Sequence, residues 1–432
     1  MVKTQECYNV AVPITSSSAI KKFFQHGFLN VVGGAVASFL SFLFNYIVVQ
    51  KTTVADYGEY TSAMAYVTLF GVPLSILSLV IIKKISSQNP HKRLTYTRQL
   101  NAKLYALTRR SLPVIFLTAL LCWGWLQTQA NFVSFSTPIL ILVLLLLTAG
   151  YQWLSALLTG WQWFADIALA GIVAMGLRFL AGWGLLTLDH SLTMLYLCLV
   201  LVNLIQLGVY FWRLYVKLPL PWWTDKSSVS LQTAGRKQQD LFLSLSSIII
   251  TTGVINLDVV LIKMLTSADF AGQYSLYSLF AKILLYASQP LINVAFTFFN
   301  NRQQQAIGRQ IFVLSIGMIA LFGVGMTALY ALLPRLLILL VGKSQYLDLA
   351  PVLWWAAVFG AVYSLLMLTV QFLLARNRRL LYLGLLAPLL QVLLIYFFHQ
   401  TPVQVMLVNV GVCTAMLLTY AVGMFVHAQK TL

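Results

Sequence analysis

Thr53–Ser62 reads TVADYGEYTS, and Thr266–Ser275 reads TSADFAGQYS, about half of the 432-residue chain further on. Both segments run Thr-x-Ala-Asp-aromatic and then Gly-x-Tyr-hydroxyl, with one extra residue, Ala271, in the second segment. Self-similarity at this distance indicates that the chain contains two copies of a unit about half its length. The fold therefore depends on what kind of unit is duplicated.

The composition indicates that the repeated unit lies in a membrane. Sixty per cent of the residues are hydrophobic and 9% are charged, whereas a soluble domain carries about 25% charged residues. Such a chain cannot cover a surface that faces water. We therefore expect an integral membrane protein whose length is used for spanning segments.

Long apolar runs predict about twelve transmembrane helices, because each run approaches the ~20 residues that a helix needs to cross a bilayer. None of the runs shows the alternation of a β-barrel strand. The predicted helices cover residues 27–50, 59–82, 111–128, 137–159, 166–188, 191–212, 241–265, 273–299, 310–333, 351–375, 380–398 and 403–427.

The basic residues predict the orientation of these helices. Most of the 28 lysines and arginines fall in segments that share a side with the N-terminus, above all in a predicted loop at 83–110. Cytoplasmic segments of membrane proteins are enriched in Lys and Arg, so we expect both termini in the cytoplasm. The net charge of +18 then reflects topology and contact with anionic membrane lipids, and we expect no nucleic-acid partner.

The repeat divides the predicted helices into two equal sets. The first motif connects the first and second helices, and the second motif connects the seventh and eighth. A weaker echo, LLTGWQWFADIALAG from Leu157 and LLARNRRLLYLGLLA from Leu373, has nearly the same offset. Six helices are an even number, so the two copies are parallel and related by an axis along the membrane normal. The predicted fold is an all-α polytopic membrane protein with two parallel six-helix lobes around a central cavity.

The domain limits follow from this division. We expect a cytoplasmic leader at 1–22, an N-lobe at 23–212, a cytoplasmic linker at 213–240, a C-lobe at 241–427 and a cytoplasmic tail at 428–432. Within the repeated turns, Asp and the hydroxyl residues favour helix caps and Gly permits a tight bend. We therefore assign a structural role to the repeat residues Asp56, Gly58, Tyr60, Asp269, Gly272 and Tyr274.

The chain resembles the bacterial polysaccharide transporter family, the O-antigen-type flippases of the multidrug/oligosaccharidyl-lipid/polysaccharide exporter superfamily. The resemblance rests on the repeated Asp-aromatic-Gly-x-Tyr turn, on LILLVGKSQYLDLAPVLWW from Leu337 and on the basic turn ARNRR from Ala375. It implies a multi-pass protein of the bacterial cytoplasmic (inner) membrane. It also implies transport of undecaprenyl-diphosphate-linked oligosaccharide from the cytoplasmic to the periplasmic leaflet by alternating access. The transport would serve the biosynthesis of a surface polysaccharide (O-antigen, capsule or exopolysaccharide). Other polysaccharide assembly proteins could be partners.

Ionisable residues inside predicted spans are the candidate site residues, since each costs about 2.5–3.5 kcal/mol at a helix centre. Arg178, Lys282 and Lys263 are candidates for binding the anionic diphosphate, for which Arg offers bidentate geometry. A structural ion pair is the alternative for Arg178, with Asp258 as the main available partner, and Lys263 could instead extend to the membrane interface. Asp258 is also the candidate coupling residue.

Two other classes of protein stay open. An exporter of small cationic drugs would need acidic groups in its cavity, and Asp258 is the one convincing candidate. A membrane glycan polymerase or ligase would need a sizeable outer loop or domain, whereas the longest predicted outer connection, 334–350, is short. We therefore expect no enzyme, no catalytic residues, no cofactor and no metal site.

Overall fold

The computed structural model describes residues 16–86, 90–132, 134–218, 235–299, 305–376 and 378–429. In this part of the chain the secondary structure is helical, and ten helices are long and apolar enough to cross a membrane. The bent pair α2 (Val54–Phe70) and α3 (Val72–Ser86) makes an eleventh span, and the predicted span 111–128 lies within α4 (Pro90–Gln129). The chain is therefore a multi-pass membrane protein of the predicted fold class.

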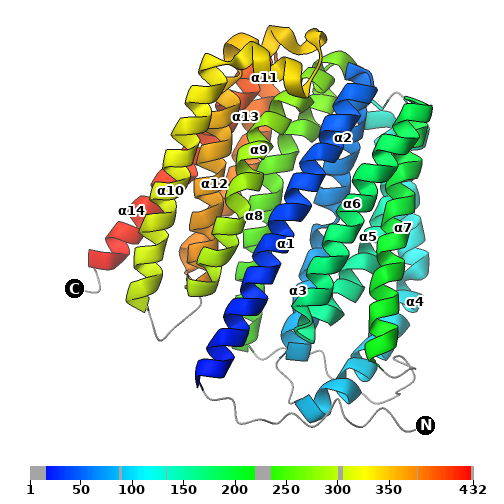
Figure 1. Ribbon diagram of the computed structural model, residues 1–432, viewed down its shortest axis with the longest axis vertical. Helices are drawn as coiled ribbons and strands as arrows, with labels where there is room; N and C mark the ends of the chain where they lie inside the picture. Colours follow the sequence, from blue (N-terminus) through cyan, green and yellow to red (C-terminus); the bar gives the residue numbers. More distant parts are fainter. Residues whose placement is uncertain are drawn as a thin grey trace.

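The helices form two lobes, which stand side by side in Figure 1. The N-lobe consists of α1 (Ser16–Lys51), α2, α3, α4, α5 (Ser136–Gly160), α6 (Phe164–Leu188) and α7 (Leu192–Lys217). The C-lobe consists of α8 (Gly235–Leu265), α9 (Ala268–Phe299), α10 (Gln305–Leu332), α11 (Pro334–Val341), η2 (Ser344–Val352), α12 (Trp354–Ala375), η3 (Arg379–Leu385), α13 (Leu386–Phe397) and α14 (Pro402–Gln429). The predicted leader, linker and tail lie partly outside the described residues.

Among the described residues, the buried core that the two lobes share takes its N-lobe members from the half of the molecule that carries both repeat motifs. The largest cluster of buried hydrophobic side chains takes members from both lobes, among them Phe44, Tyr57, Tyr274 and Tyr346. Two smaller clusters each belong to a single lobe, one around Tyr210 and the other around Phe299, Phe312 and Leu368. We call the end that carries both repeat motifs the motif end, and the end at which α1 begins and α14 ends the terminal end. The lobes are joined at the motif end.

Each repeat motif supplies a hydroxyl cap for the helix that follows it, and the two capping residues are at neighbouring rather than equivalent positions of the repeat. Thr53 is the N-cap of α2, and its hydroxyl accepts the backbone N–H of Asp56 at 3.1 Å and donates to the Asp56 carboxylate at 2.7 Å. In the second copy the Ser267 hydroxyl accepts the N–H of Phe270 at the start of α9. The hydroxyl residues are thus the caps, while Asp56 and Asp269 occupy the first turns, where a negative charge is favoured by the helix dipole.

The second predicted span is broken. α2 ends at Phe70, and the axis turns by 44° at Gly71 before α3 begins. Pro73 contributes to this break because proline lacks a backbone N–H and cannot continue the helical hydrogen-bond pattern of the preceding turn. Pro290, at a roughly similar place in the second half of the chain, lies inside the continuous helix α9. The lobes therefore differ in the helix that leaves the motif.

The prediction of a loop at 83–110 is wrong. α3 continues to Ser86, and α4 begins at Pro90, so most of this basic segment is helical. Its apolar residues recur at helical spacing, and Leu100 and Leu104 are buried against the N-lobe. Arg93 lies over the ring of Trp161 at 5.7 Å, and the Trp161 indole N–H donates to Thr97 at 3.3 Å. Packing of one face thus keeps a strongly charged segment helical.

Candidate functional site

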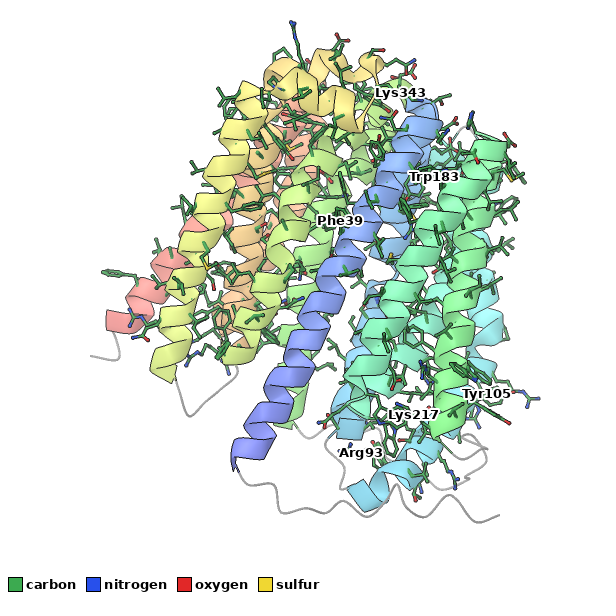
Figure 2. The ribbon with its side chains drawn as sticks, in the orientation of Figure 1. Phe39, Arg93, Tyr105, Trp183, Lys217 and Lys343 are labelled. Carbon is green, nitrogen blue, oxygen red and sulfur yellow. The ribbon has the colours of Figure 1, made fainter. Side chains whose placement is uncertain are left out.

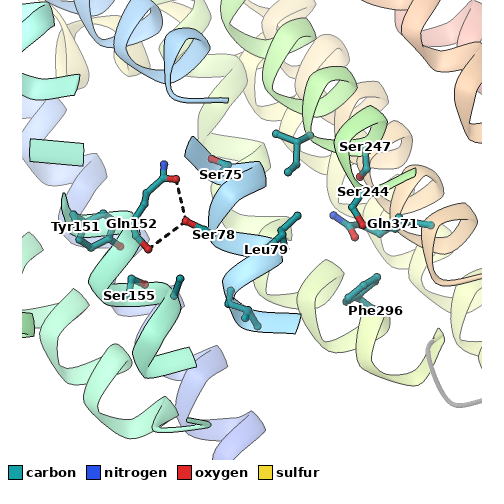
Figure 3. Close-up of a pocket in the computed structure, with 14 residues that line it drawn as sticks. Ser75, Ser78, Leu79, Tyr151, Gln152, Ser155, Ser244, Ser247, Phe296 and Gln371 are labelled. Carbon is teal, nitrogen blue, oxygen red and sulfur yellow. Dashed lines mark hydrogen bonds between the residues drawn. The ribbon is translucent and has the colours of Figure 1, made fainter. Parts of the chain in front are cut away.

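A cavity of about 680 Å³ lies between the lobes towards the terminal end. α3 and α5 line it from the N-lobe, and α8, α9 and α12 line it from the C-lobe. The polar side chains of the lining are Ser75, Ser78, Tyr151, Gln152, Ser155, Ser244, Ser247 and Gln371 (Figure 3). We call this space the inter-lobe cavity.

The described lining of the inter-lobe cavity carries no charged side chain and combines uncharged polar groups with a larger apolar surface. Its hydroxyl and amide groups can both donate and accept hydrogen bonds, and apolar residues such as Leu79 and Phe296 lie among them. Ser78 is close to the Gln152 backbone carbonyl at 3.2 Å and to its side-chain oxygen at 3.4 Å (Figure 3). Among the described lining residues there is no carboxylate, and the polar side chains offer hydrogen bonds.

The repeat motifs close the motif end by meeting each other. Thr61 and Ser275 are equivalent residues of the two copies, and their hydroxyl oxygens lie 2.5 Å apart. Gly58 and Gly272 are also equivalent, and a Cβ atom placed on Gly58 would lie 2.6 Å from the Gly272 nitrogen. Contact between equivalent residues is the geometry of a two-fold axis. Glycine is required at both positions because the helix backbones touch.

A buried ion pair crosses the same contact. Glu59 on α2 and Lys263 on α8 are each about 1% exposed, and the Lys263 amino nitrogen lies 3.9 Å from a Glu59 oxygen. Glu59 also accepts the backbone N–H of Ser134 at 3.0 Å and the hydroxyl of Thr137. Lys263 therefore lies in the closed motif end and not in the described cavity lining. Glu59 was not among the residues that the sequence pointed to.

Further polar contacts hold the lobes together at the motif end. The Gln50 side-chain amide at the end of α1 donates to the Gly342 carbonyl at 2.6 Å and to the Val341 carbonyl at 3.3 Å. The Lys343 amino group donates to the Thr52 carbonyl at 2.7 Å. On the other side of the contact, Asn131 donates to the Met264 carbonyl at 2.7 Å. These bonds would all have to break if the motif end opened.

Arg178 has no carboxylate partner among the described residues. Its guanidinium donates to the hydroxyl of Tyr60 at 3.1 Å and lies over the ring of Phe44 at 4.5 Å. The Nε atom has no hydrogen-bond partner, and no described Asp or Glu oxygen comes within ion-pair distance. Tyr60 precedes Thr61, whose hydroxyl contacts Ser275 of α9, so the arginine lies near the C-lobe. An arginine in this setting retains hydrogen-bonding capacity for an anion.

Asp258 belongs to a network within the C-lobe. Its carboxylate accepts the hydroxyl of Tyr274 at 2.5 Å and the side-chain amide of Asn409 at 2.9 Å, and Gln391 donates to Asn409 at 2.7 Å. Lys282 interacts with Asp258 electrostatically, without a direct ion pair among the described residues. Asp258 is therefore not the partner of Arg178. The repeated tyrosines Tyr60 and Tyr274 each bind an ionisable side chain in their own lobe, an arginine in one lobe and an aspartate in the other.

Lys282 lies on the face of α9 that is turned towards the N-lobe. Ser275, Lys282, Tyr286 and Phe296 recur at spacings of three and four, or sums of these, which places them on one helix face. Ser275 contacts the N-lobe at the motif end, and Phe296 lines the inter-lobe cavity. Lys282 is 14 residues from Phe296, about 21 Å along the helix. Lys282 and Arg178 thus lie between the cavity and the closed end.

The comparisons with known proteins concern the fold. No family model matches the sequence, and no curated protein sequence matches it. Among solved structures, the lipid II flippase MurJ in an inward closed conformation superposes with a TM-score of 0.66 at 11% identity, covering 93% of this chain and 87% of that chain. The chain shares the fold of MOP-superfamily transporters.

Two further structures support this assignment of fold. A multidrug resistance MATE family transporter of the MOP superfamily, in an inward-facing conformation, gives a TM-score of 0.65 at 12% identity over 91% of this chain and 94% of that chain. A MOP-superfamily transporter from Pyrococcus furiosus, described as having a binding pocket of reverse polarity, gives 0.59 at 12% identity over 95% of both chains. Likeness at this level of identity establishes architecture and leaves the cargo open.

Proposed function

We propose that the chain is a flippase that moves a lipid-linked oligosaccharide diphosphate from the cytoplasmic to the outer leaflet by alternating access. The motif end would face the periplasm and the terminal end the cytoplasm of a bacterial inner membrane, as the distribution of Lys and Arg indicates. The described conformation is closed at the motif end, with its cavity towards the terminal end. It would be the state that receives the cargo.

The observation that carries this proposal is the set of uncharged polar side chains that lie among apolar ones in the lining of the inter-lobe cavity. Sugars present many hydroxyl groups, and serine, tyrosine and glutamine side chains can donate to or accept from each of them. The cavity volume of about 680 Å³ lies within the ~300–1,000 Å³ range of small-molecule sites. Leu79 and Phe296 supply apolar surface for the less polar faces of the sugar rings.

The diphosphate would be bound by the cations beyond the cavity. Arg178 comes from the N-lobe and Lys282 from the C-lobe, and both lie on the way from the cavity to the motif end. Positive groups in a water-filled path offset the loss of phosphate hydration. Lys263 would join them when the motif end opens and its pair with Glu59 separates. Asp258 is our candidate for the coupling residue, because it is a fully buried carboxyl group that Tyr274 and Asn409 hold in place by hydrogen bonds.

An exporter of small cationic drugs is less well supported. Such a cargo favours carboxylates in the cavity, and the described lining contains none. A membrane polymerase or ligase lacks support as well, because the connection 334–350 folds into the short helix α11 and the turn η2. We therefore propose a non-enzymatic transporter.

The decisive experiment is reconstitution of the purified protein into liposomes that contain a fluorescent lipid-linked oligosaccharide in both leaflets. Transport lets a membrane-impermeant quencher or glycosidase reach the whole pool, whereas empty liposomes expose only the outer half. The matched variant is Gln152→Leu, which keeps the side-chain size but removes the hydrogen bonds of the cavity lining. Loss of flipping in this variant supports the proposal. Absence of flipping by the wild type, together with efflux of a cationic dye, would establish the drug-exporter alternative.

A further inference from the structure

A second cavity, of about 690 Å³, lies on the outside of the N-lobe between α4, α5 and α7. Asn101 and Tyr105 come from α4, Trp153 from α5, and Leu204 and Gly208 from α7. We call this space the α4 groove. It lies behind the inter-lobe cavity, because Gly150, Trp153 and Leu154 line the groove while the neighbouring Tyr151, Gln152 and Ser155 line the cavity. α5 therefore separates the two spaces.

One polar group inside the α4 groove has an unused hydrogen bond. Asn101 is 2% exposed, and its side-chain oxygen accepts the indole N–H of Trp153 at 3.3 Å. Its side-chain nitrogen is buried and has no hydrogen-bond partner. Leaving a buried donor unsatisfied is unfavourable. An acceptor atom of a bound molecule would satisfy this amide.

The rest of the groove is apolar and is bordered by positive charge. Leu204 and Phe211 are about half exposed on the surface that faces lipid, where the groove opens. Tyr105 is exposed at the edge of the lobe (Figure 2). Arg109 is exposed and lies four residues beyond Tyr105 and eight beyond Asn101, on the same face of α4. Such a site suits a hydrocarbon chain that carries an anionic head group.

We propose that the α4 groove binds one anionic phospholipid of the bilayer. The acyl chain lies along Leu204, Gly208 and Phe211, the Asn101 amide donates to an oxygen of the ester or phosphate, and Arg109 pairs with the head-group charge. Because α5 separates the groove from the inter-lobe cavity, the ligand is a resident membrane lipid and not the hydrocarbon tail of transported cargo. The inference does not depend on the proposed function.

Native mass spectrometry of the purified full-length protein tests the site. Phosphatidylglycerol and phosphatidylcholine with identical acyl chains are added in turn, and retained lipid is counted. The wild type should keep a phosphatidylglycerol molecule under conditions that remove phosphatidylcholine. Gly208→Leu should lose it, because a Cβ on Gly208 meets no atom within 4 Å and the longer side chain fills the groove. The control is Gly317→Leu on α10, which is equally open and belongs to the other lobe.

A second variant tests the proposal in case Gly208→Leu fails to fold. Asn101→Asp keeps the size of the side chain but places a carboxylate against the lipid phosphate, so it should abolish the preference for phosphatidylglycerol. Equal retention of both lipids by the wild type, or unchanged retention in both variants, would overturn the proposal. So would displacement of phosphatidylglycerol by a polyprenyl phosphate, because the groove would then be a site for the tail of the cargo.

Discussion

The contact between the two repeat motifs makes Gly272→Ala a sensitive test of how the motif end opens. A methyl group at this position would lie 2.0 Å from the backbone oxygen of Val54. Cβ atoms essentially never come closer than 3.0 Å to another heavy atom, and ordinary contact begins at 3.4 Å. The two helices must therefore separate by 1.0 to 1.4 Å at this point. A carbonyl oxygen of the main chain cannot rotate away as a side chain would.

The cost of this change falls on the closed state. Overpacking of a well-packed contact costs about 1–3 kcal/mol, which corresponds to a roughly 5- to 150-fold change in an equilibrium. Alanine is otherwise favourable in a helix, and Gly272 has no positive φ that would forbid it. We expect Gly272→Ala to shift the population towards states in which the motif end is open.

The assay is the distance between spin labels at the motif end of each lobe. Asp189 follows α6 and Gln400 precedes α14, and both are exposed. With the four native cysteines replaced, Asp189→Cys and Gln400→Cys report the separation of the lobes by pulsed electron paramagnetic resonance. Gly272→Ala should increase the share of long distances. Gly317→Ala is the matched control, since a methyl group there meets nothing within 4 Å.

A substitution at Gly58 tests the same contact between the two helices. Gly58→Ala places its methyl group against the same helix, so one separation relieves both contacts, and the double variant should exceed either single variant by less than their sum. Distance distributions for Gly272→Ala that match those of the wild type and of Gly317→Ala would refute the account. A general loss of thermal stability without longer distances would refute it as well.

Three further predictions follow from the charged residues. Arg178→Ala should abolish flipping in liposomes while the protein still accumulates in the membrane. Arg178→Lys should retain part of the flipping activity, because the charge remains without the bidentate geometry. Reduced accumulation of Arg178→Ala would indicate a structural role instead. Lys263→Met should lower the free energy of unfolding by about 3–5 kcal/mol, since the buried Glu59 loses its ion pair with Lys263. Adding Glu59→Met should recover most of that loss in a denaturation experiment. Single cysteines at Ser344 and Arg378 should react with an impermeant reagent from opposite sides of the membrane; labelling from one side would contradict the assigned topology.

Hydropathy and the repeat predicted the spans and the two lobes because both signals are carried by long stretches of chain. The charge density of the segment at 83–110 predicts a loop, whereas most of the segment is helical, because charge density carries no information on helical period. Leu100 and Leu104 recur at the spacing of a buried helix face, and this signal could have identified the N-terminal part of α4. The sequence indicates the helix break at Gly71 only weakly, through Pro73.

The sequence singles out candidate site residues where a charge inside an apolar run is costly, and their roles stay predictions. Arg178 and Asp258 stand out in apolar runs, and the structure gives each a defined hydrogen-bond partner. Glu59 has no comparable signal in the sequence, because it lies inside the repeat motif and the same position of the second copy is Gln273, which carries no charge. The lining of the inter-lobe cavity had no signal at all, because single serines and glutamines in apolar helices become a site only when two lobes place them opposite each other.

The equivalent contact positions also bear on how such a chain could have arisen. Glu59 corresponds to Gln273 in the other copy, and Lys263 corresponds to Gln50. If the ancestor was a pair of identical subunits, any ion pair across its axis had to occur twice, and every substitution changed both sites at once. Gene fusion removes that constraint. One site now carries opposite charges and its counterpart carries two amides, so natural selection can adjust the strength of each half separately.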